Sequence, residues 1–299
     1  MPNFQGILPA VVTPVDAGES FNAAAFRALL DRCYAAGVDG VYVCGQTGEG
    51  LQQSAEQRMR VTDVAVEHSP AGKQVIAHIG AFSTREAVAL ARHAAEAGAA
   101  AVSALPPFGA YSFPEIKAYY AAIAEASTVP LLVYYFTPLA GGMAHVDQLL
   151  ELCALPNVAG LKFTDSDMYK LAELVRSGAT VFNGSDEMLV AGLLRGAHGG
   201  IGSIYNLIPE FFVELYQLSQ AGQWTEASAL QDRINNLIRI ILRYPVFPAV
   251  KTLLCWSGID CGPCLKPRRD LTAEEALDLS VRVAATEFAP QFSAGGPPR

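Results

Sequence analysis

The sequence predicts a closed (β/α)₈ TIM barrel with a C-terminal helical extension, and two observations lead to this fold class. Short apolar segments alternate eight times with amphipathic helical segments, and the apolar segments are nearly continuous, which is typical of strands covered on both faces. The 299-residue chain also accommodates the roughly 250 residues that such a barrel needs. An open doubly wound sheet is the alternative, but no segment has the features of an edge strand.

Eight apolar segments provide the strands. They cover residues 7–15, 38–45, 74–80, 99–107, 129–136, 158–165, 179–186 and 199–206. Between them, the spacing of apolar residues predicts helices that include 21–37, 85–98 and 114–126. The first two of these end in a glycine, which suits a helix C-terminus.

The pattern changes after residue 222, where only helical segments follow, over 224–244, 247–258 and 272–288. We therefore expect the barrel to occupy residues 1–222 and a helical extension to occupy 223–299. The last seven residues, SAGGPPR, are too rich in glycine and proline to pack, which predicts a disordered tail.

Composition restricts the class of partner. The chain is 51% hydrophobic and carries a formal net charge of −8, and its longest run of basic residues is the pair Arg268–Arg269. This argues against binding to nucleic acid or to an anionic membrane and favours a small-molecule substrate. The N-terminal segment lacks the features of a signal peptide, and no apolar run is long enough to span a bilayer. The expected location is the cytoplasm.

Six cysteines are scattered through apolar segments, as reduced core cysteines are, so no disulfide framework is indicated. The segment Cys261-Gly262-Pro263-Cys264 matches the thioredoxin redox motif in its letters. That motif opens a helix in a βαβ unit, whereas this segment follows a predicted helix and precedes no strand. A Gly-Pro turn is the favoured interpretation over a redox site.

Lys162 lies inside the apolar segment 158–165, where burying an ammonium group is costly. Either the lysine lies near the strand end and extends its amine to solvent, or burial lowers its pKa and leaves a nucleophilic amine. The residue spacing alone favours the first interpretation.

Polar residues gather where the predicted strands end, which is where barrel enzymes place their active sites. The second strand ends in the turn Gly45–Gly50, which either binds an anion or serves only as a turn, and it lacks the ending of a nucleotide-binding P-loop. Asp186 and Glu187 put negative charge where a phosphate would bind, which favours an uncharged polyol. The five histidines show no metal-ligand spacing, so neither a metal nor a cofactor is expected.

Four motifs carry a resemblance to a known family. They are Gly45–Glu49 as G-x-T-G-E, Tyr134, Gly160-Leu161-Lys162 and Gly199–Ser203. In this order they resemble the pyruvate-dependent aldolase family of dihydrodipicolinate synthase and N-acetylneuraminate lyase, over about residues 6–288. The resemblance implies a (β/α)₈ barrel, a homotetramer, and a Schiff base between Lys162 and pyruvate. It reverses the interpretation of Lys162 that spacing alone favours.

The resemblance also implies roles for individual residues. Lys162 and Tyr134 would be catalytic, the first as the nucleophile and the second as the proton relay. The substrate-binding residues would be Gln46, Thr47, Gly48, Thr164, Gly184, Asp186, Glu187 and Ser203. Of these, Thr47 and Gly48 would hold the carboxylate of pyruvate, and the last five would hold a polyhydroxylated tail.

Within the family, segments 160–167, 183–187 and 201–206 are most similar to those of the lyase, which implies cleavage of N-acetylneuraminate to pyruvate and N-acetylmannosamine. Dihydrodipicolinate synthases usually carry an arginine soon after the tyrosine, and 136–140 contains none. Gln46 stands where relatives commonly have a hydroxyl, and Gly109 where they often have a tyrosine. Two alternatives therefore stay open: an aldolase or dehydratase for another 2-keto-3-deoxy sugar acid, and a non-catalytic barrel that binds pyruvate or a sugar acid.

Overall fold

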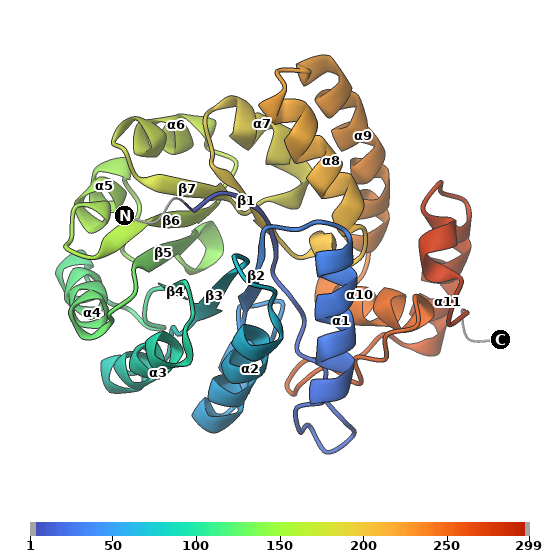
Figure 1. The fold of residues 1–299 in the computed structure, drawn as a ribbon, viewed down its shortest axis with the longest axis horizontal. Coiled ribbons are helices and arrows are strands. Elements are labelled where there is room, and N and C mark those ends of the chain that lie inside the picture. The colour runs from blue at the N-terminus through green and yellow to red at the C-terminus, as the bar shows by residue number, and fades with distance from the viewer. Residues whose placement is uncertain (1–3, 297–299) are drawn as a thin grey trace.

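A computed structural model describes residues 4–296 and confirms the barrel (Figure 1). The eight parallel strands follow the order β1-β8-β7-β6-β5-β4-β3-β2, and the bridge between Ala10 and Tyr42 connects β1 to β2. The strands are β1 (Gly6–Pro9), β2 (Gly40–Val43), β3 (Gln74–His78), β4 (Ala101–Ala104), β5 (Leu131–Phe136), β6 (Val158–Thr164), β7 (Thr180–Asn183) and β8 (Gly199–Gly202). β1 and β2 stand at the two ends of this order and are joined by the bridge, so the sheet closes into a barrel.

Eight helices surround the sheet and three more follow it. They are α1 (Ala23–Ala35), α2 (Ala55–His68), α3 (Thr84–Ala97), α4 (Phe113–Ala126), α5 (Val146–Cys153), α6 (Met168–Arg176), α7 (Leu189–Leu194), α8 (Pro209–Gln220), α9 (Trp224–Ile241), α10 (Val246–Trp256) and α11 (Ala273–Ala284). Short 3₁₀ helices are η1 (Gly50–Gln52), η2 (Thr137–Leu139), η3 (Asp186–Met188), η4 (Ile204–Asn206) and η5 (Ala289–Phe292).

Local sequence signals define the helix ends. The side chains of Asn22, Ser54 and Ser83 accept hydrogen bonds from the first turns of α1, α2 and α3. Gly98 ends α3 in the left-handed conformation that glycine tolerates best. The first strand is shorter than the predicted 7–15, because Pro9 and Pro14 have no N–H to donate to a neighbouring strand.

Two apolar cores hold the barrel together. The larger core lies between the strands and the surrounding helices, and the smaller one fills the barrel interior. The interior core consists of Phe4, Leu8, Ala10, Tyr42, Ile76, Ala101, Leu132, Ala159, Phe182 and Ile201. Because these side chains fill the lower barrel, the polar chemistry lies above them, at the C-terminal strand ends.

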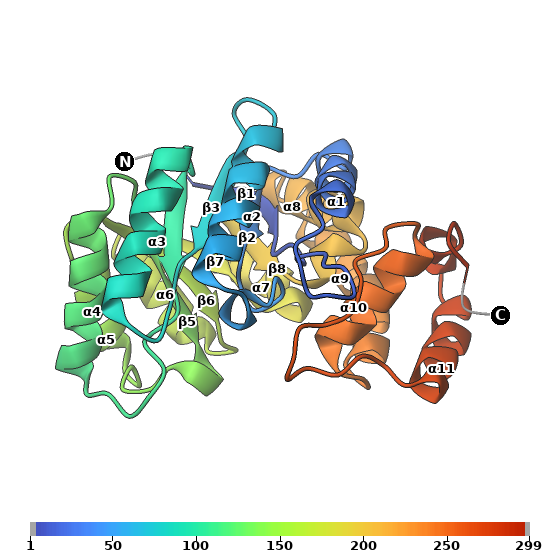
Figure 2. The same cartoon turned by 90° about the horizontal axis from the view of Figure 1, so that it is seen from below.

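The three C-terminal helices lie on one side of the barrel, next to α1 and α8 (Figures 1 and 2). They contact α7, α8, η3 and η4, so they support the ends of β7 and β8. The predicted disordered tail includes residues 297–299, which lie outside the described residues, and it stays a prediction. In the described part, Gly295 N–H donates to Trp256 O at 2.6 Å.

Candidate active site

Lys162 lies in the middle of the strand ends, on β6 between Tyr134 of β5 and Phe182 of β7. Its residue is only 5% exposed, so the side chain does not reach solvent as a strand-end lysine would. Burial lowers the pKa of its amine from 10.5 to about 7, and the negative charge of Asp186 partly opposes this shift. A substantial fraction of the amine is therefore neutral, and hence nucleophilic, near neutral pH.

Two tyrosine rings enclose the amine of Lys162. Its Nζ lies 4.3 Å from the ring centroid of Tyr134 and 4.6 Å from that of Tyr42. Tyr134 was expected here, whereas sequence reasoning missed Tyr42. The available signal was alternation along a strand: Tyr42 lies three residues before the end of the segment 38–45, as Lys162 lies three residues before the end of 158–165.

Tyr134 is almost fully buried. Burial raises the pKa of its phenol, so the hydroxyl is protonated in the resting site. The Thr164 hydroxyl lies toward Tyr134, but its Oγ1 is buried and completes no hydrogen bond of normal geometry with any described group. A buried hydroxyl without a partner is costly, so Thr164 is available to bind a ligand atom.

The turn after β2 brings Thr47 against the end of β8, where the Thr47 and Ser203 hydroxyls lie 2.6 Å apart. Within residues 4–296, the backbone N–H groups of Thr47 and Gly48 donate to no protein acceptor. Gly48 must be glycine, because a Cβ there would lie 2.9 Å from Val11 O. Two hydroxyls and two free amides thus face one small region, which suits a carboxylate.

The turn after β2 does not lead directly into α2. Glu49 adopts a left-handed conformation, with φ of 53°, and Gln53 is extended, so only η1 follows the turn and α2 begins at Ala55. The macrodipole of α2 therefore contributes little to anion binding here, because its effect falls off within the first turn. The hydroxyls and amides of the turn itself remain as the candidate groups for binding an anion.

Gln46 lies at the mouth of the barrel and not in its buried interior. Its side chain is half-buried and lines a pocket of about 160 Å³ with Leu51, Gln52, Phe108, Leu139 and Arg268. Gln46 makes no hydrogen bond to the Thr47 and Ser203 hydroxyls among the described residues.

Asp186 is a buried carboxylate that joins the ends of β7 and β8. Its Oδ2 accepts a hydrogen bond from Ile204 N at 2.7 Å, and burial raises its pKa to about 7. Gly202 leaves room for it, because a Cβ there would lie 2.0 Å from Oδ1. In the same way, Gly184 leaves room for Thr164, whose Oγ1 would lie 2.0 Å from a Cβ at that position.

Glu187 is exposed on η3, next to Asp186. Its side chain makes no hydrogen bond to the described residues, and its backbone carbonyl accepts one from Asn235 at 3.2 Å. The structure therefore gathers Lys162, Tyr134, Thr164 and Asp186 in the buried centre and places Glu187 at the rim.

A buried ion pair connects the site to the C-terminal extension, and sequence reasoning missed it. Lys251 Nζ on α10 lies 2.7 Å from Glu49 Oε2, and both residues are almost fully buried. The attraction is ionic, since Oε2 accepts no hydrogen bond of ordinary angle. Glu49 Oε1 also accepts from Leu265 N at 2.9 Å. The turn that carries Thr47 and Gly48 is thereby fixed to α10 and to the loop that follows it.

The CGPC segment forms part of that loop. Cys261 O accepts a hydrogen bond from Val15 N at 3.0 Å, and Pro263 O accepts one from Lys251 Nζ at 2.7 Å. Both cysteines are buried free thiols whose pKa burial raises to about 12. Such thiols hold almost no thiolate at neutral pH, so the geometry favours the structural turn over the redox interpretation.

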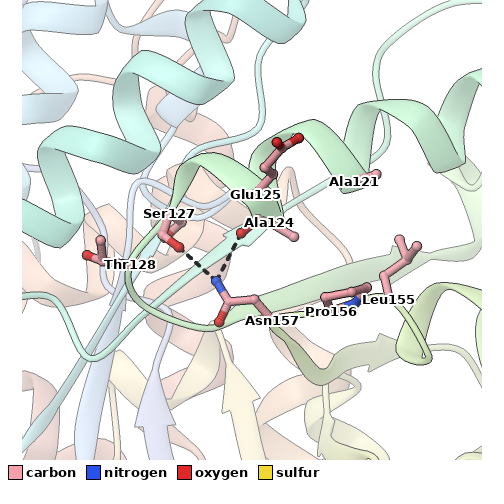
Figure 3. Close-up of a pocket in the computed structure, with 8 residues that line it drawn as sticks. All are labelled: Ala121, Ala124, Glu125, Ser127, Thr128, Leu155, Pro156 and Asn157. Carbon is pink, nitrogen blue, oxygen red and sulfur yellow. Dashed lines mark hydrogen bonds between the residues drawn. The ribbon is translucent and has the colours of Figure 1, made fainter.

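A larger pocket, of about 550 Å³, opens at the opposite end of the barrel (Figure 3). It lies below the N-terminal ends of β5 and β6, where Asn157 donates hydrogen bonds to Ala124 O and Ser127 O at 3.0 and 2.8 Å. Glu125 is the only ionisable residue in its lining. It is remote from Lys162, and we regard it as a feature of the structural end of the barrel.

Among residues 4–296, no group of three or more histidine, cysteine or acidic residues is arranged to bind a metal ion. In the same part of the chain, no helix combines the length and the apolar character that crossing a bilayer requires.

Comparison with known proteins places these features in a family. Residues 3–286 match the model of the dihydrodipicolinate synthetase family. The chain belongs to this family. A family member from Rhizobium meliloti, described as N-acetylneuraminate lyase, is 39% identical over 285 residues, which cover 94% of each chain.

Solved structures in the family agree with this membership. A protein from Clostridium difficile, determined in complex with mannosamine, has a TM-score of 0.90 at 28% identity and covers 97% of this chain and 100% of its own. A sialic acid aldolase from Ruminococcus gnavus, described as a catalytic lysine mutant, has a TM-score of 0.89 at 27% identity, with 94% of both chains covered.

Proposed function

We propose that this chain is a Schiff-base aldolase that cleaves N-acetylneuraminate into pyruvate and N-acetylmannosamine. The observation that carries the proposal is the buried amine of Lys162, enclosed by tyrosine rings and without a carboxylate partner at ion-pair distance in the described structure. The identity to proteins described as N-acetylneuraminate lyases supports the substrate.

The first step is attack by the neutral amine of Lys162 on the keto carbon of the open-chain sugar acid. A carbon–nitrogen bond forms, the keto oxygen takes up two protons and leaves as water, and the nitrogen keeps a positive charge as an iminium. One of these protons comes from the amine and the other from the surrounding acid groups or solvent. The low amine pKa keeps part of Lys162 reactive at neutral pH.

The second step breaks a carbon–carbon bond. A base removes the proton from the hydroxyl next to the breaking bond, that carbon becomes the aldehyde of N-acetylmannosamine, and the bonding electrons move to the iminium to give an enamine. We assign this proton transfer to Tyr134 acting as a relay: its hydroxyl accepts the proton and passes its own proton to the carboxylate of the substrate, because its raised pKa disfavours a free phenolate. Protonation of the enamine carbon and hydrolysis then release pyruvate and restore the amine.

Binding is divided between two groups of residues. The hydroxyls of Thr47 and Ser203 and the free amides of Thr47 and Gly48 form the proposed carboxylate site. Ser203 was expected to hold the tail, but its hydroxyl lies 2.6 Å from that of Thr47, which favours the carboxylate site instead. Thr164, whose Oγ1 completes no hydrogen bond of normal geometry, and Asp186 lie where the polyhydroxylated tail would extend, with the Gly184 backbone beside them. Glu187 would contact the far end of the tail from the rim, and Gln46 would border the entrance.

Gln46 supports a second candidate, an aldolase or dehydratase for another 2-keto-3-deoxy sugar acid. It provides an amide where relatives commonly supply a hydroxyl, and it lines the pocket at the mouth. A different residue at position 46 would change which substrate tail the site accepts while leaving Lys162 and Tyr134 in place. If the protein forms the adduct but does not turn over a sugar acid, the non-catalytic barrel is the remaining alternative.

Assembly and location complete the proposal. We propose a cytoplasmic homotetramer, as the family resemblance implies. Several large apolar side chains are more than half exposed in the isolated chain, which is consistent with assembly: Phe82, Leu194, Leu242, Leu277 and Val281. Light scattering coupled to size exclusion would measure the number of subunits, and a monomer would refute this part.

The decisive experiment is reductive trapping. The protein is incubated with borohydride and either N-acetylneuraminate or pyruvate, and the added mass is located by peptide mapping. A pyruvate-sized adduct on Lys162 in both samples supports the lyase. An adduct with pyruvate alone leaves the Schiff base and favours another sugar acid, and an adduct on a different lysine, or none, overturns the proposal.

A further inference from the structure

Tyr42 occupies a place beside the reactive amine that the proposed reaction does not yet use. Its ring is fully buried in the barrel interior, and its centroid lies 4.6 Å from Lys162 Nζ. The rings of Tyr42 and Tyr134 are 6.2 Å apart and meet edge to face at 82°. The amine thus lies within cation–π distance of two aromatic rings from different strands.

The ring of Tyr42 is fixed from two sides. Its hydroxyl donates to Ser103 Oγ on β4 at 3.1 Å. Its edge packs under the turn after β2, where a Cβ at Gly45 would lie 2.6 Å from Cε1. Burial raises the pKa of the phenol well above its ordinary value, so the ring is neutral when the enzyme works. Tyr42 therefore offers Lys162 a rigid, uncharged aromatic surface.

The other polar groups around the Lys162 amine are a neutral histidine and a buried carboxylate. His78 has its ring centroid 6.2 Å from Tyr42 and 6.1 Å from Tyr134. Its Nδ1 donates to Cys44 O and its Nε2 accepts from Leu105 N, both at 3.1 Å, which fixes a neutral ring. The carboxylate of Asp186 is the charged group that acts on Lys162. Burial raises the pKa of Asp186 to about 7, so this carboxylate is partly protonated near neutral pH.

We infer that Tyr42 is a positioning residue for the Schiff-base chemistry, whose ring holds the lysine nitrogen in place and stabilises its positive charge as an iminium. This rests on the proposed function, because that chemistry carries the nitrogen from a neutral amine to an iminium and back. In a buried site with little water, an aromatic face is one of the few groups that stabilise a cation without deprotonating it. The ring thus favours the charged intermediate and does not block the neutral nucleophile.

The test separates the ring from the hydroxyl and from packing. Tyr42→Phe keeps the ring, and Tyr42→Leu removes it. A series of mono-, di- and trifluorinated phenylalanines at position 42 keeps the shape while weakening the ring's attraction for cations. Tyr120→Leu is the matched control, because Tyr120 on α4 is also fully buried and its hydroxyl donates to Ala104 O on β4.

For each variant, the rate of pyruvate trapping on Lys162 is measured against pH, together with kcat and KM for the sugar acid. We expect Tyr42→Phe to stay within about twofold of the wild type, and Tyr42→Leu to lose about 3- to 30-fold in kcat. The fluorinated series should lower kcat stepwise and move the midpoint of the pH profile downward, because the lysine cation loses stabilisation. Tyr120→Leu should lower stability without moving that midpoint.

The outcomes distinguish this inference from the proposed function. If the wild type gives no adduct on Lys162, the proposed function itself fails. If the wild type gives the adduct but the fluorinated series leaves both kcat and the pH midpoint unchanged, only the role of Tyr42 fails. The fluorinated series keeps the shape of the ring, so it tests this role even if Tyr42→Leu does not fold.

Discussion

Two lysines of this chain are equally buried and have opposite surroundings. Lys162 on β6 is 5% exposed and Lys251 on α10 is 4% exposed. Lys162 faces tyrosine rings and has no carboxylate at ion-pair distance among the described residues, whereas Lys251 lies 2.7 Å from Glu49 Oε2. Burial without a partner favours a neutral, reactive amine, while burial beside a carboxylate favours an ammonium that holds structure. The partner, more than the depth, decides what a buried lysine does.

The largest expected effect comes from removing the reactive amine. Lys162→Met should lower turnover of the sugar acid by roughly 10⁴-fold or more and abolish borohydride trapping, because the nucleophile is lost. Lys251→Met should still give an adduct on Lys162 in whatever fraction of it folds. Trapping that persists in Lys162→Met would show that the two lysines have been assigned the wrong roles.

Lys162→Met should also be more stable than the wild type. Unfolded Lys162 holds its proton up to a pKa near 10.5, and the folded residue only up to about 7. Between these values the unfolded state binds more protons, so the free energy of unfolding of the wild type rises with pH, and below pH 7 the full cost remains. Lys162→Met removes this cost, which urea unfolding at pH 7 would measure as a gain.

The second effect concerns the free energy of unfolding and comes from the ion pair between Glu49 and Lys251. Glu49→Gln leaves the Lys251 ammonium buried without its counter-ion and should lower the free energy of unfolding by about 3 to 5 kcal/mol. Urea unfolding measures it, with Glu151→Gln as the control, because Glu151 pairs with Lys117 at the surface. Adding Lys251→Met to Glu49→Gln should recover part of the loss. Equal destabilisation by Glu49→Gln and by the control would contradict the structural role of the pair.

A moderate effect is expected from pH. The trapping rate with pyruvate should rise about tenfold per unit at low pH, because the amine must lose its proton, and level off above about pH 7. Asp186→Asn should move the midpoint lower, since the negative charge that favours the ammonium is gone. The rate measured between about pH 5 and 9 checks both. A midpoint near that of an exposed lysine would refute the neutral amine.

The smallest effect is expected at the CGPC loop, where Pro263 O accepts a hydrogen bond from Lys251. Cys261→Ala should leave turnover unchanged, and native Cys261 and Cys264 should not react with a thiol reagent at pH 7, because burial raises their pKa to about 12. Exposed Cys255 provides the positive control. Rapid modification of either buried cysteine in the folded protein would restore the redox interpretation.

The sequence predicts the barrel well because its signals are local and repeated. Alternating apolar and amphipathic segments, together with capping residues such as Ser83 and Gly98, indicate the order of strands and helices without knowledge of their packing. The extent of the first strand was less predictable, since Pro9 and Pro14 shorten its pairing within an apolar run. Short 3₁₀ turns such as η1 depend on single backbone conformations, here that of Glu49, which periodicity does not reveal.

The position of Lys162 and Tyr134 beside each other at the strand ends was predictable from the sequence, because each lies in a clear strand segment, and their catalytic roles stay a proposal. Tyr42 was missed because an inward tyrosine on a strand resembles any core aromatic until the lysine is placed beside it. The pair of Glu49 and Lys251 was missed for another reason: 202 positions separate its members in the chain, and neither segment alone indicates a partner. Long-range electrostatic pairs of this kind become visible only in three dimensions.

The hydrogen bond from Leu265 N to Glu49 Oε1 has a consequence for how the protein is made. Translation adds Glu49 about 200 residues before its partners Lys251, Leu265 and Arg268. Until then the carboxylate has nothing to neutralise it, and we expect the turn that carries Thr47 to stay solvated and unformed. The barrel of a nascent chain can therefore collapse early, while the turn proposed to bind the carboxylate stays unformed until residues 251–268 are made. A chain released before Lys251 would hold a barrel in which this turn is not fixed.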